Sequence, residues 1–247
     1  MNLRYTLRAR KFRTKWDPAE IDWIMDNVDD GGVVFDIGAH KGGWTYWLRK
    51  AVGNSGRIFA FEPQPNLHCY LEKIFSSNYW NNLTLEELAL SNTAAPVRMF
   101  IPGKPGSTSP GASLKQEVLN HETEMHSTQV SRTTLDDYLA GAAIEKIDFF
   151  KVDVEGSELD LLEGAAGTLR DYQASWIIES EARHIGEDGV IKLFSIMEKT
   201  GYEGRFFLAG QLIPVSQFSF SKHQGRETER FWDHPDYCNN FLFTRND

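Results

Sequence analysis

The fold of this chain is decided by Val33–Gly42, which reads VVFDIGAHKG. An apolar run leads into Asp36, and two glycines, Gly38 and Gly42, bracket a tight turn before a helix-like stretch. A second apolar run ends in FAFEP, in which the acid is Glu62. The pattern predicts a strand, a glycine turn, a helix and a second strand with a carboxylate at its tip. Such a unit is typical of sites for nucleoside-bearing cofactors. Glycine lets a ligand approach the backbone, and an acid roughly 20 residues further on accepts hydrogen bonds from the ribose hydroxyls.

The spacing within the turn separates two kinds of cofactor. A dinucleotide fingerprint reads Gly-x-Gly-x-x-Gly and places a pyrophosphate on the helix N-terminus. Here the order is Asp-x-Gly-x-x-x-Gly, and Asp36 would repel a pyrophosphate. A cofactor with an ammonium and a sulfonium tolerates that acid, so the pattern favours S-adenosylmethionine over NAD(P). The alternatives are an NAD(P)-dependent oxidoreductase of the Rossmann type, a module that binds S-adenosylmethionine without turnover, and an ordinary strand–helix–strand unit with a glycine turn.

Predicted strands and helices alternate along much of the chain. Apolar runs predict strands at 33–37, 57–61, 83–90, 97–101, 147–152, 175–178, 202–208, 211–215 and 241–244. Helical spacing of apolar residues predicts helices at 18–27, 43–51, 65–75, 134–139, 159–163 and 189–199, the first of them capped by Asp17. The alternation indicates an α/β fold with a doubly wound, mostly parallel sheet. The late strands have no helix between them, which predicts an antiparallel hairpin at one edge.

Acidic residues end most of these strands. Of the five tips that can be identified, four carry Asp36, Glu62, Asp153 and Glu179, and the fifth is Ala89–Ser91. In an open α/β sheet, ligands bind at the carboxyl ends of the strands, so these acids predict one site. We expect Asp36 and the glycine turn to hold the amino-acid end of the cofactor, Glu62 the ribose, and Leu88 and Ala89 the adenine. The expected cofactor-binding residues are Asp36, Gly38, Ala39, His40, Lys41, Gly42, Glu62, Pro63, Leu88, Ala89 and Asp153.

Composition limits the class of protein. The chain has 247 residues, of which 41% are hydrophobic, enough for one decorated α/β domain. The net charge of −9 does not favour a nucleic-acid partner. There is no apolar run of about 18 residues and no secretory signal pattern, so we expect no transmembrane segment. The two cysteines, Cys69 and Cys238, are expected to be free thiols in the cytoplasm.

Two segments stand outside this regular pattern. Residues 1–30 are expected to form a basic, helical N-terminal extension to a domain of residues 31–247; the first 15 hold six basic side chains and no acid. That extension is either a solvated helix or tail, or a patch for an anionic partner. Residues 102–132 are rich in Gly, Ser, Pro and Thr at their start, and are either a lid or acceptor-binding insertion or a surface loop without a role.

Several stretches resemble the FkbM-type S-adenosylmethionine-dependent methyltransferases. The matching pieces are Phe35–Gly42, Phe61–Pro63, Leu88–Asn92, Thr134–Leu139, Ile147–Gly156, Glu163–Ala165 and Asn240–Phe243. The most specific is Lys151–Glu158, whereas His40 stands where the family often has Asn. The resemblance implies a class I methyltransferase fold, a seven-stranded sheet whose last strand is antiparallel. It also implies O-methylation of a hydroxyl on a sugar, a glycan or a secondary metabolite.

Methylation of an alcohol calls for a base within hydrogen-bond reach of the acceptor hydroxyl. The candidates are Asp153, Glu155, Glu179, Glu181 and His184, and we expect His184, Glu155 and Asp153 to be catalytic. An unperturbed histidine titrates near neutral pH, which suits His184 to base work, although it could equally be a surface histidine. Asp153 and Glu179 could together hold Mg²⁺, but a bound metal is not expected.

Overall fold

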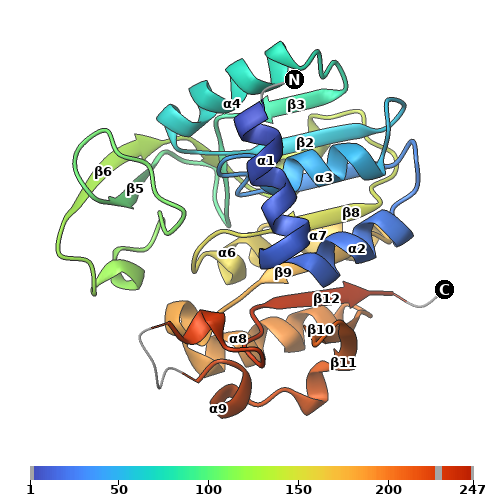
Figure 1. Cartoon of the computed structure of the whole chain (residues 1–247), viewed down its shortest axis with the longest axis vertical. Coiled ribbons are helices and arrows are strands. Elements are labelled where there is room, and N and C mark those ends of the chain that lie inside the picture. The colour runs from blue at the N-terminus through green and yellow to red at the C-terminus, as the bar shows by residue number, and fades with distance from the viewer. Residues whose placement is uncertain (1–2, 226–229, 246–247) are drawn as a thin grey trace.

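The computed structural model describes residues 3–225 and 230–245 and centres on an eight-stranded sheet (Figure 1). In spatial order the strands are β11 (Gln211–Pro214), β10 (Glu203–Leu208), β12 (Asn240–Thr244), β9 (Ser175–Glu179), β8 (Phe149–Val152), β1 (Val33–Ile37), β2 (Arg57–Phe61) and β3 (Leu83–Glu86). The five strands from β9 to β3 are parallel. The expected doubly wound, mostly parallel sheet is therefore confirmed.

The antiparallel edge confirms one expectation and corrects another. The last strand, β12, runs antiparallel to both β9 and β10, as expected. The expected count of seven strands is wrong, because β11 pairs with β10 as an eighth. The two residues between them, Ala209 and Gly210, both have positive φ, +49° and +77°. Such a two-residue turn matches the twist of a hairpin and lets the chain add this strand.

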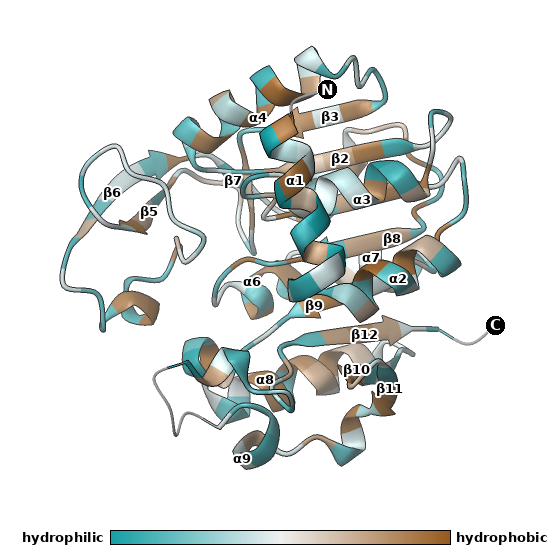
Figure 2. Ribbon diagram, viewed as in Figure 1, coloured by the Kyte–Doolittle hydropathy of each residue, from teal (hydrophilic) through white to brown (hydrophobic). Residues whose placement is uncertain are grey.

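Helices cover both faces of the sheet. They are α1 (Leu3–Lys11), α2 (Pro18–Asn27), α3 (Gly43–Ala51), α4 (Pro65–Ser77), α5 (Leu135–Ala140), α6 (Glu158–Glu163), α7 (Ala166–Asp171), α8 (Ala182–Lys199) and α9 (Phe220–His223). A π-helical turn, Phe12–Trp16, follows α1, and three short 3₁₀ turns lie at Gln116–Leu119, Val215–Gln217 and Phe231–Asp233. The core strands are mainly apolar, whereas the helices show bands of both kinds (Figure 2).

The alternation of side chains along each strand assigns the two cores. Phe35 and Phe150 point to one face, where α5, α6, α7 and α8 pack. Val34 and Phe149 point to the other, against α2 and α3. Because successive strand residues face opposite sides, both faces of the central strands must be apolar, which is what a sheet buried on both sides requires.

The segment after β3 leaves the main sheet. The predicted single strand 83–90 is wrong: β3 ends at Glu86, and β4 (Ala89–Leu90) pairs instead with β7 (Arg132–Thr133) in a small parallel sheet. The strand β5 (Val97–Pro102) forms a hairpin with β6 (Met125–Val130), which stands at one side of the main sheet (Figure 1). The segment 102–132 thus contains a strand, Met125–Val130.

One helix start and one helix cap also differ from the prediction. The helix expected at 189–199 begins at Ala182, and a non-helical Gly186 (φ +74°) interrupts it. Asp17 does precede α2 as predicted, but its carboxylate makes no cap hydrogen bond and instead accepts one from Trp44 Nε1 at 2.9 Å. Because the Asp17 carboxylate is bonded to Trp44, it does not cap the helix that it precedes.

The N-terminal helix α1 is not the solvated helix or tail that we considered. It packs beside α3 and contributes Tyr5 and Ala9, 1% and 0% exposed, to a core shared with α3 and α4. Leu3 and Leu7, by contrast, lie on its exposed side. One face of this basic helix is therefore part of the packed structure.

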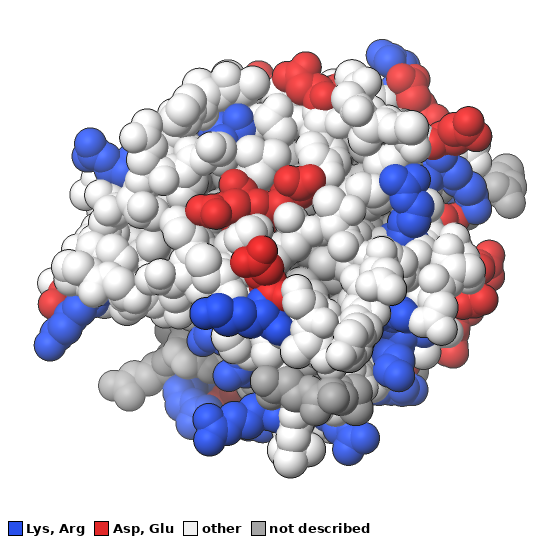
Figure 3. Space-filling view, turned by 90° about the horizontal axis from the view of Figure 1, so that it is seen from above, with Lys and Arg blue, Asp and Glu red and all other residues white. Residues whose placement is uncertain are grey.

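The surface carries charge of both signs. On the face drawn in Figure 3, one group of acidic side chains lies near the centre, and basic and further acidic side chains lie toward the edges. Within residues 3–225 and 230–245, we find no helix with the length and apolar character needed to span a bilayer. Both cysteines are free thiols, as expected, with Cys69 exposed and Cys238 buried.

A very close backbone approach lies between the glycine turn after β1 and the residue after β8. A Cβ atom on Gly38 would lie 1.8 Å from the carbonyl oxygen of Asp153, and Gly38 has φ +87°. Only glycine satisfies both conditions, because a side chain would collide with backbone and would be strained at this φ. The glycine thus lets the ends of β1 and β8 meet.

Gly38→Ala is expected to destabilise the fold by about 3 kcal/mol or more, because backbone strain and steric overlap add. Gly106→Ala is the matched control: Gly106 has φ +86°, but no atom lies within 4 Å of the position that its added methyl group would take. The control should lose only about 1 kcal/mol. Equal losses in urea unfolding would show that the contact with Asp153 does not constrain the fold.

Candidate active site

The glycine turn places its residues by unusual backbone angles. Gly38, His40 and Gly42 all have positive φ, at +87°, +48° and +74°. Asn and His are among the few non-glycine residues that adopt this conformation readily. His40 can therefore replace the Asn that the family often has at this position, because both residues adopt positive φ.

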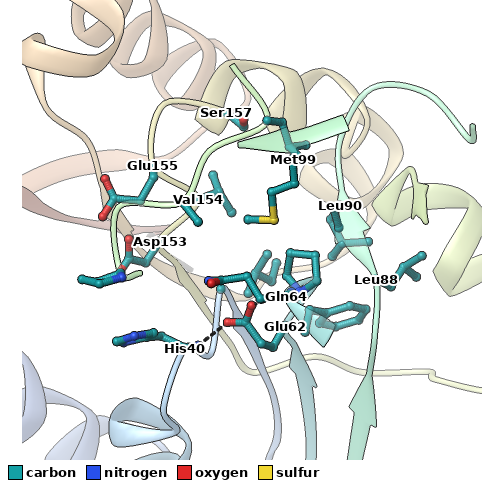
Figure 4. A pocket seen from close by; sticks show the side chains of 18 residues that line it. His40, Glu62, Gln64, Leu88, Leu90, Met99, Asp153, Val154, Glu155 and Ser157 are labelled. Atoms are coloured by element: carbon teal, nitrogen blue, oxygen red, sulfur yellow. Dashed lines mark hydrogen bonds between the residues drawn. The ribbon is translucent and has the colours of Figure 1, made fainter. Parts of the chain in front are cut away.

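A cavity of about 620 Å³ opens at the carboxyl ends of β1, β2 and β8 (Figure 4). Asp153 and Glu155 lie on one side, Leu88 and Leu90 on the other, with Glu62 between them. Of the residues expected in the site, Gly38, His40, Glu62, Pro63, Leu88, Ala89, Asp153 and Glu155 line this cavity. Residues that the sequence did not single out also line it: Ile37, Phe61, Gln64, Leu90, Met99, Pro110, Ala112, Leu114, Val154 and Ser157.

Glu62 lies at the base of the first cavity and is only 2% exposed. Its two carboxylate oxygens accept hydrogen bonds from the backbone N–H groups of His40 (2.7 Å) and Gln64 (2.8 Å). Burial raises the pKa of Glu62 to about 8 although these two bonds favour the ionised form. The turn after β1 and the turn after β2 are thus tied together through a carboxylate that titrates near neutral pH.

A second cavity, of about 690 Å³, adjoins the first and shares Gly38, His40 and Asp153 with it. Its other lining residues are Arg8, Phe12, Trp16, Asp36, Ala39, Lys41, Gly43, Trp44 and Lys151. The expected site residues Asp36, Ala39 and Lys41 are therefore here and not in the first cavity. Gly42 lines neither cavity, and its carbonyl accepts a hydrogen bond from Tyr5 (2.7 Å).

The second cavity is lined by one fully buried lysine, Lys151, which faces several carboxylates. Lys151 is 1% exposed, and its Nζ lies 3.9 Å from Glu179 Oε2 and 5.2 Å from the ring centre of Trp44. Burial lowers the pKa of Lys151, but four carboxylates (Asp153, Glu179, Asp17 and Asp36) outweigh it and raise the pKa. Burial also raises the pKa of both Asp36 and Asp17 to about 6. Several carboxylates thus share one lysine.

Of the expected catalytic residues, Asp153 and Glu155 line the first cavity, and His184 contacts Glu155. His184 Nε2 lies 3.3 Å from Glu155 Oε2, and both side chains are largely buried. Glu155 lines the cavity, whereas His184 stands behind it and is not among the lining residues. Burial, with Asp153 nearby, raises the pKa of Glu155 well above its usual range.

The other two base candidates are occupied elsewhere. Glu179 accepts a hydrogen bond from Asn239 (2.8 Å) as well as facing Lys151. Glu181 accepts hydrogen bonds from Arg183 (2.6 Å) and from the Tyr237 hydroxyl. Among the residues that the structure describes, no group of three or more His, Cys, Asp or Glu side chains is arranged to hold a metal ion.

A family model, the methyltransferase FkbM domain, matches residues 36–204, from the acid of β1 to β10. The chain belongs to the FkbM methyltransferase family. This family identity agrees with the resemblance found in the sequence, and it disfavours the nicotinamide-dependent alternative.

Two relatives extend the comparison. Methyltransferase 1 of Beauveria bassiana is 26% identical over 147 residues, which are 55% of this chain and 59% of that protein. The crystal structure of an FkbM methyltransferase from Methylobacillus flagellatus superposes with a TM-score of 0.52 at 13% identity, covering 97% of this chain and 59% of that one. The chain therefore spans less than two thirds of the length of either relative. The structural likeness shows the class I methyltransferase fold.

Three parts of the site were missed at the level of sequence. Lys151 lies inside the most specific matching block, but nothing local shows that its side chain turns toward four acids. The lining residues Pro110, Ala112 and Leu114 come from a segment without periodicity. Arg8 and Trp16 come from the N-terminal segment, where only the basic composition was visible.

Lys151→Met is expected to cost about 3 kcal/mol or more near pH 8, because it leaves buried carboxylates without their counter-ion. The loss should shrink toward about pH 5, where Asp36 and Asp17, whose pKa values are about 6, are already protonated in the folded wild type. Chemical denaturation at both pH values measures this. Lys73→Met, at an exposed lysine of α4, is the control, and a pH-independent loss in Lys151→Met would contradict the charge argument.

Proposed function

We propose that this chain transfers a methyl group from S-adenosylmethionine to a hydroxyl oxygen of a small acceptor, a sugar, a glycan or a secondary metabolite. One observation carries the proposal. A cavity with the buried acid Glu62 at its base adjoins a second cavity, which is lined by Asp36, Asp153 and basic side chains, and the family's glycine turn contributes to both. S-adenosylmethionine also has two parts, an adenosine and an amino-acid end that carries the sulfonium. We assign one part to each cavity.

The lining residues fit the adenosine in the first cavity. The carboxylate of Glu62 can accept hydrogen bonds from the ribose hydroxyls in addition to its two backbone bonds, because ionised carboxylates offer about four acceptor positions. Leu88, Ala89 and Phe61 offer apolar surface to a purine ring. We therefore assign Glu62 to the ribose, and Leu88 and Ala89 to the adenine.

The charges in the second cavity fit the cationic end. Asp36 and Asp153 line it, and the buried Lys151 is shared among four carboxylates. An ammonium or sulfonium placed beside Asp36 and Asp153 lowers the repulsion between these acids. When bound, S-adenosylmethionine supplies an electrophilic methyl group on its sulfonium sulfur.

We assign the proton-accepting role to Glu155, with His184 as its positioning residue. Glu155 lines the cavity beside Asp153 and has a raised pKa, which makes its carboxylate a stronger base than an ordinary glutamate. His184 lies behind it at 3.3 Å and fixes its orientation. Asp153 faces both cavities, so it can orient the reacting groups.

The acceptor is proposed to enter beneath the segment at 102–132, which we interpret as a lid of the methyltransferase domain. Gln64 binds this segment in both directions: its amide donates to the Ser109 carbonyl (3.0 Å) and accepts from the Ser109 N–H (3.1 Å). Ser113 donates to the Glu155 carbonyl at 2.6 Å. The segment therefore lies directly over the proposed base and contributes Ala112 and Leu114 to the cavity wall.

The first test is binding of S-adenosylhomocysteine by calorimetry, followed by methyl transfer from a labelled donor to a panel of hydroxyl-bearing sugars and secondary metabolites. We expect binding of S-adenosylhomocysteine and labelling of a hydroxyl oxygen. Folded protein that binds NADH and not S-adenosylhomocysteine would overturn the proposal.

Donor binding should release protons near pH 7. The pKa of Glu62 in the free protein is about 8, and only its ionised form accepts both ribose hydrogen bonds, so affinity should rise with pH and level off above about pH 8. Calorimetry of S-adenosylhomocysteine in two buffers of different ionisation enthalpy measures the release. Glu62→Gln should bind more weakly and lose this proton release, whereas an unchanged release would remove Glu62 from the ribose site.

Glu155→Gln and His184→Ala should each lower kcat by about 100-fold or more, as expected for loss of a general base or of its orientation. Their affinity for S-adenosylhomocysteine should stay within about twofold of wild type, since neither is assigned to the donor. His234→Ala, at an exposed histidine that lines neither cavity, is the control. Full activity in both variants would transfer the role to another residue.

A further inference from the structure

The second cavity carries a pair of basic side chains that the proposed function has not used. Arg8 comes from α1 and Lys41 from the glycine turn, and both line this cavity. Among residues 3–225 and 230–245, neither makes an ion pair or a side-chain hydrogen bond. They differ in this from Lys151, whose charge is shared among acids.

The two basic groups lie close enough to repel each other. Burial, together with the charge of Arg8, lowers the pKa of Lys41. Burial, with Lys41 and Arg8, also lowers the pKa of His40 to about 4, so the imidazole is neutral at physiological pH. An anion placed between Arg8 and Lys41 would remove this repulsion and gain charge-assisted hydrogen bonds.

The helix that carries Arg8 is fixed against the glycine turn. Tyr5 donates to the Gly42 carbonyl (2.7 Å), and Trp47 Nε1 donates to the Ala9 carbonyl (2.7 Å). A Cβ on Gly43 would lie only 2.0 Å from the ring of Phe12, so α3 and the turn after α1 are in direct contact. Arg8 is therefore held in place beside the cavity by a packed element.

Acids and bases thus line the second cavity, which shares Gly38, His40 and Asp153 with the first cavity. Asp36 and Asp153 suit an ammonium, and Arg8 and Lys41 suit a carboxylate, so the lining matches a zwitterionic amino acid. We propose that Arg8 and Lys41 bind the α-carboxylate of S-adenosylmethionine, and that α1, outside the residues matched by the family, completes the donor site. This inference rests on the proposed function.

The test compares two ligands that differ only in this group: S-adenosylhomocysteine and its decarboxylated form, S-adenosyl-3-thiopropylamine. Calorimetry of the full chain would measure both on wild type, Arg8→Ala, Lys41→Ala and Arg10→Ala. Arg10 is the control, because it lies on the same helix but is exposed. Arg8→Ala should weaken binding of S-adenosylhomocysteine by about tenfold or more and change the decarboxylated ligand by less than about twofold. Lys41→Ala should act in the same direction, and Arg10→Ala should change neither.

Each outcome is decisive. Equal weakening of both ligands by both variants, or no weakening of either, would overturn the carboxylate assignment while leaving the donor site in place. A rise in acceptor KM with unchanged S-adenosylhomocysteine affinity would also overturn it and assign Arg8 to the acceptor. If wild type binds neither ligand, the proposed function itself fails.

Discussion

The buried ammonium of Lys151 holds together the acids on which the site depends. Asp17, Asp36, Asp153 and Glu179 come from four separate segments, and each contributes to the raised pKa of this lysine. One positive charge does not balance four carboxylates, and burial already raises the pKa of Asp36 and Asp17 to about 6. The part of the second cavity beside Asp36 and Asp153 therefore favours a positively charged group, while Arg8 and Lys41 line the same cavity.

The backbone contact between Gly38 and Asp153 brings the carboxylates at the ends of β1 and β8 close together. Because Gly38 has no side chain, the ends of β1 and β8 can meet there. The two cavities share Gly38, His40 and Asp153 as lining residues. Glu62 then connects the turns after β1 and β2 through two backbone hydrogen bonds. We propose that this frame holds the two ends of the methyl donor side by side, with α1 and the turn after it packed against the glycine turn and α3 through Tyr5 and Phe12.

Local patterns in the sequence were enough to predict the parallel strands and the acids at their tips, because strand periodicity and glycine spacing are short-range signals. The same signals failed where contacts between distant segments decide how a strand pairs or where a side chain lies. The run 83–90 was predicted as one strand, yet Glu86 ends β3 and Ala89 pairs with Arg132 in another sheet. The positions of Arg8 and Leu114 depend on contacts made across the fold, and the direction in which Lys151 points depends on the acids around it.

The most direct test of this account is a crystal structure of the chain with S-adenosylhomocysteine bound. The account predicts the ribose hydroxyls at the Glu62 carboxylate and the amino-acid end in the second cavity, with its ammonium toward Asp36 and Asp153. A ligand bound away from Glu62, or with its amino-acid end outside the cavity beside Lys151, would contradict it.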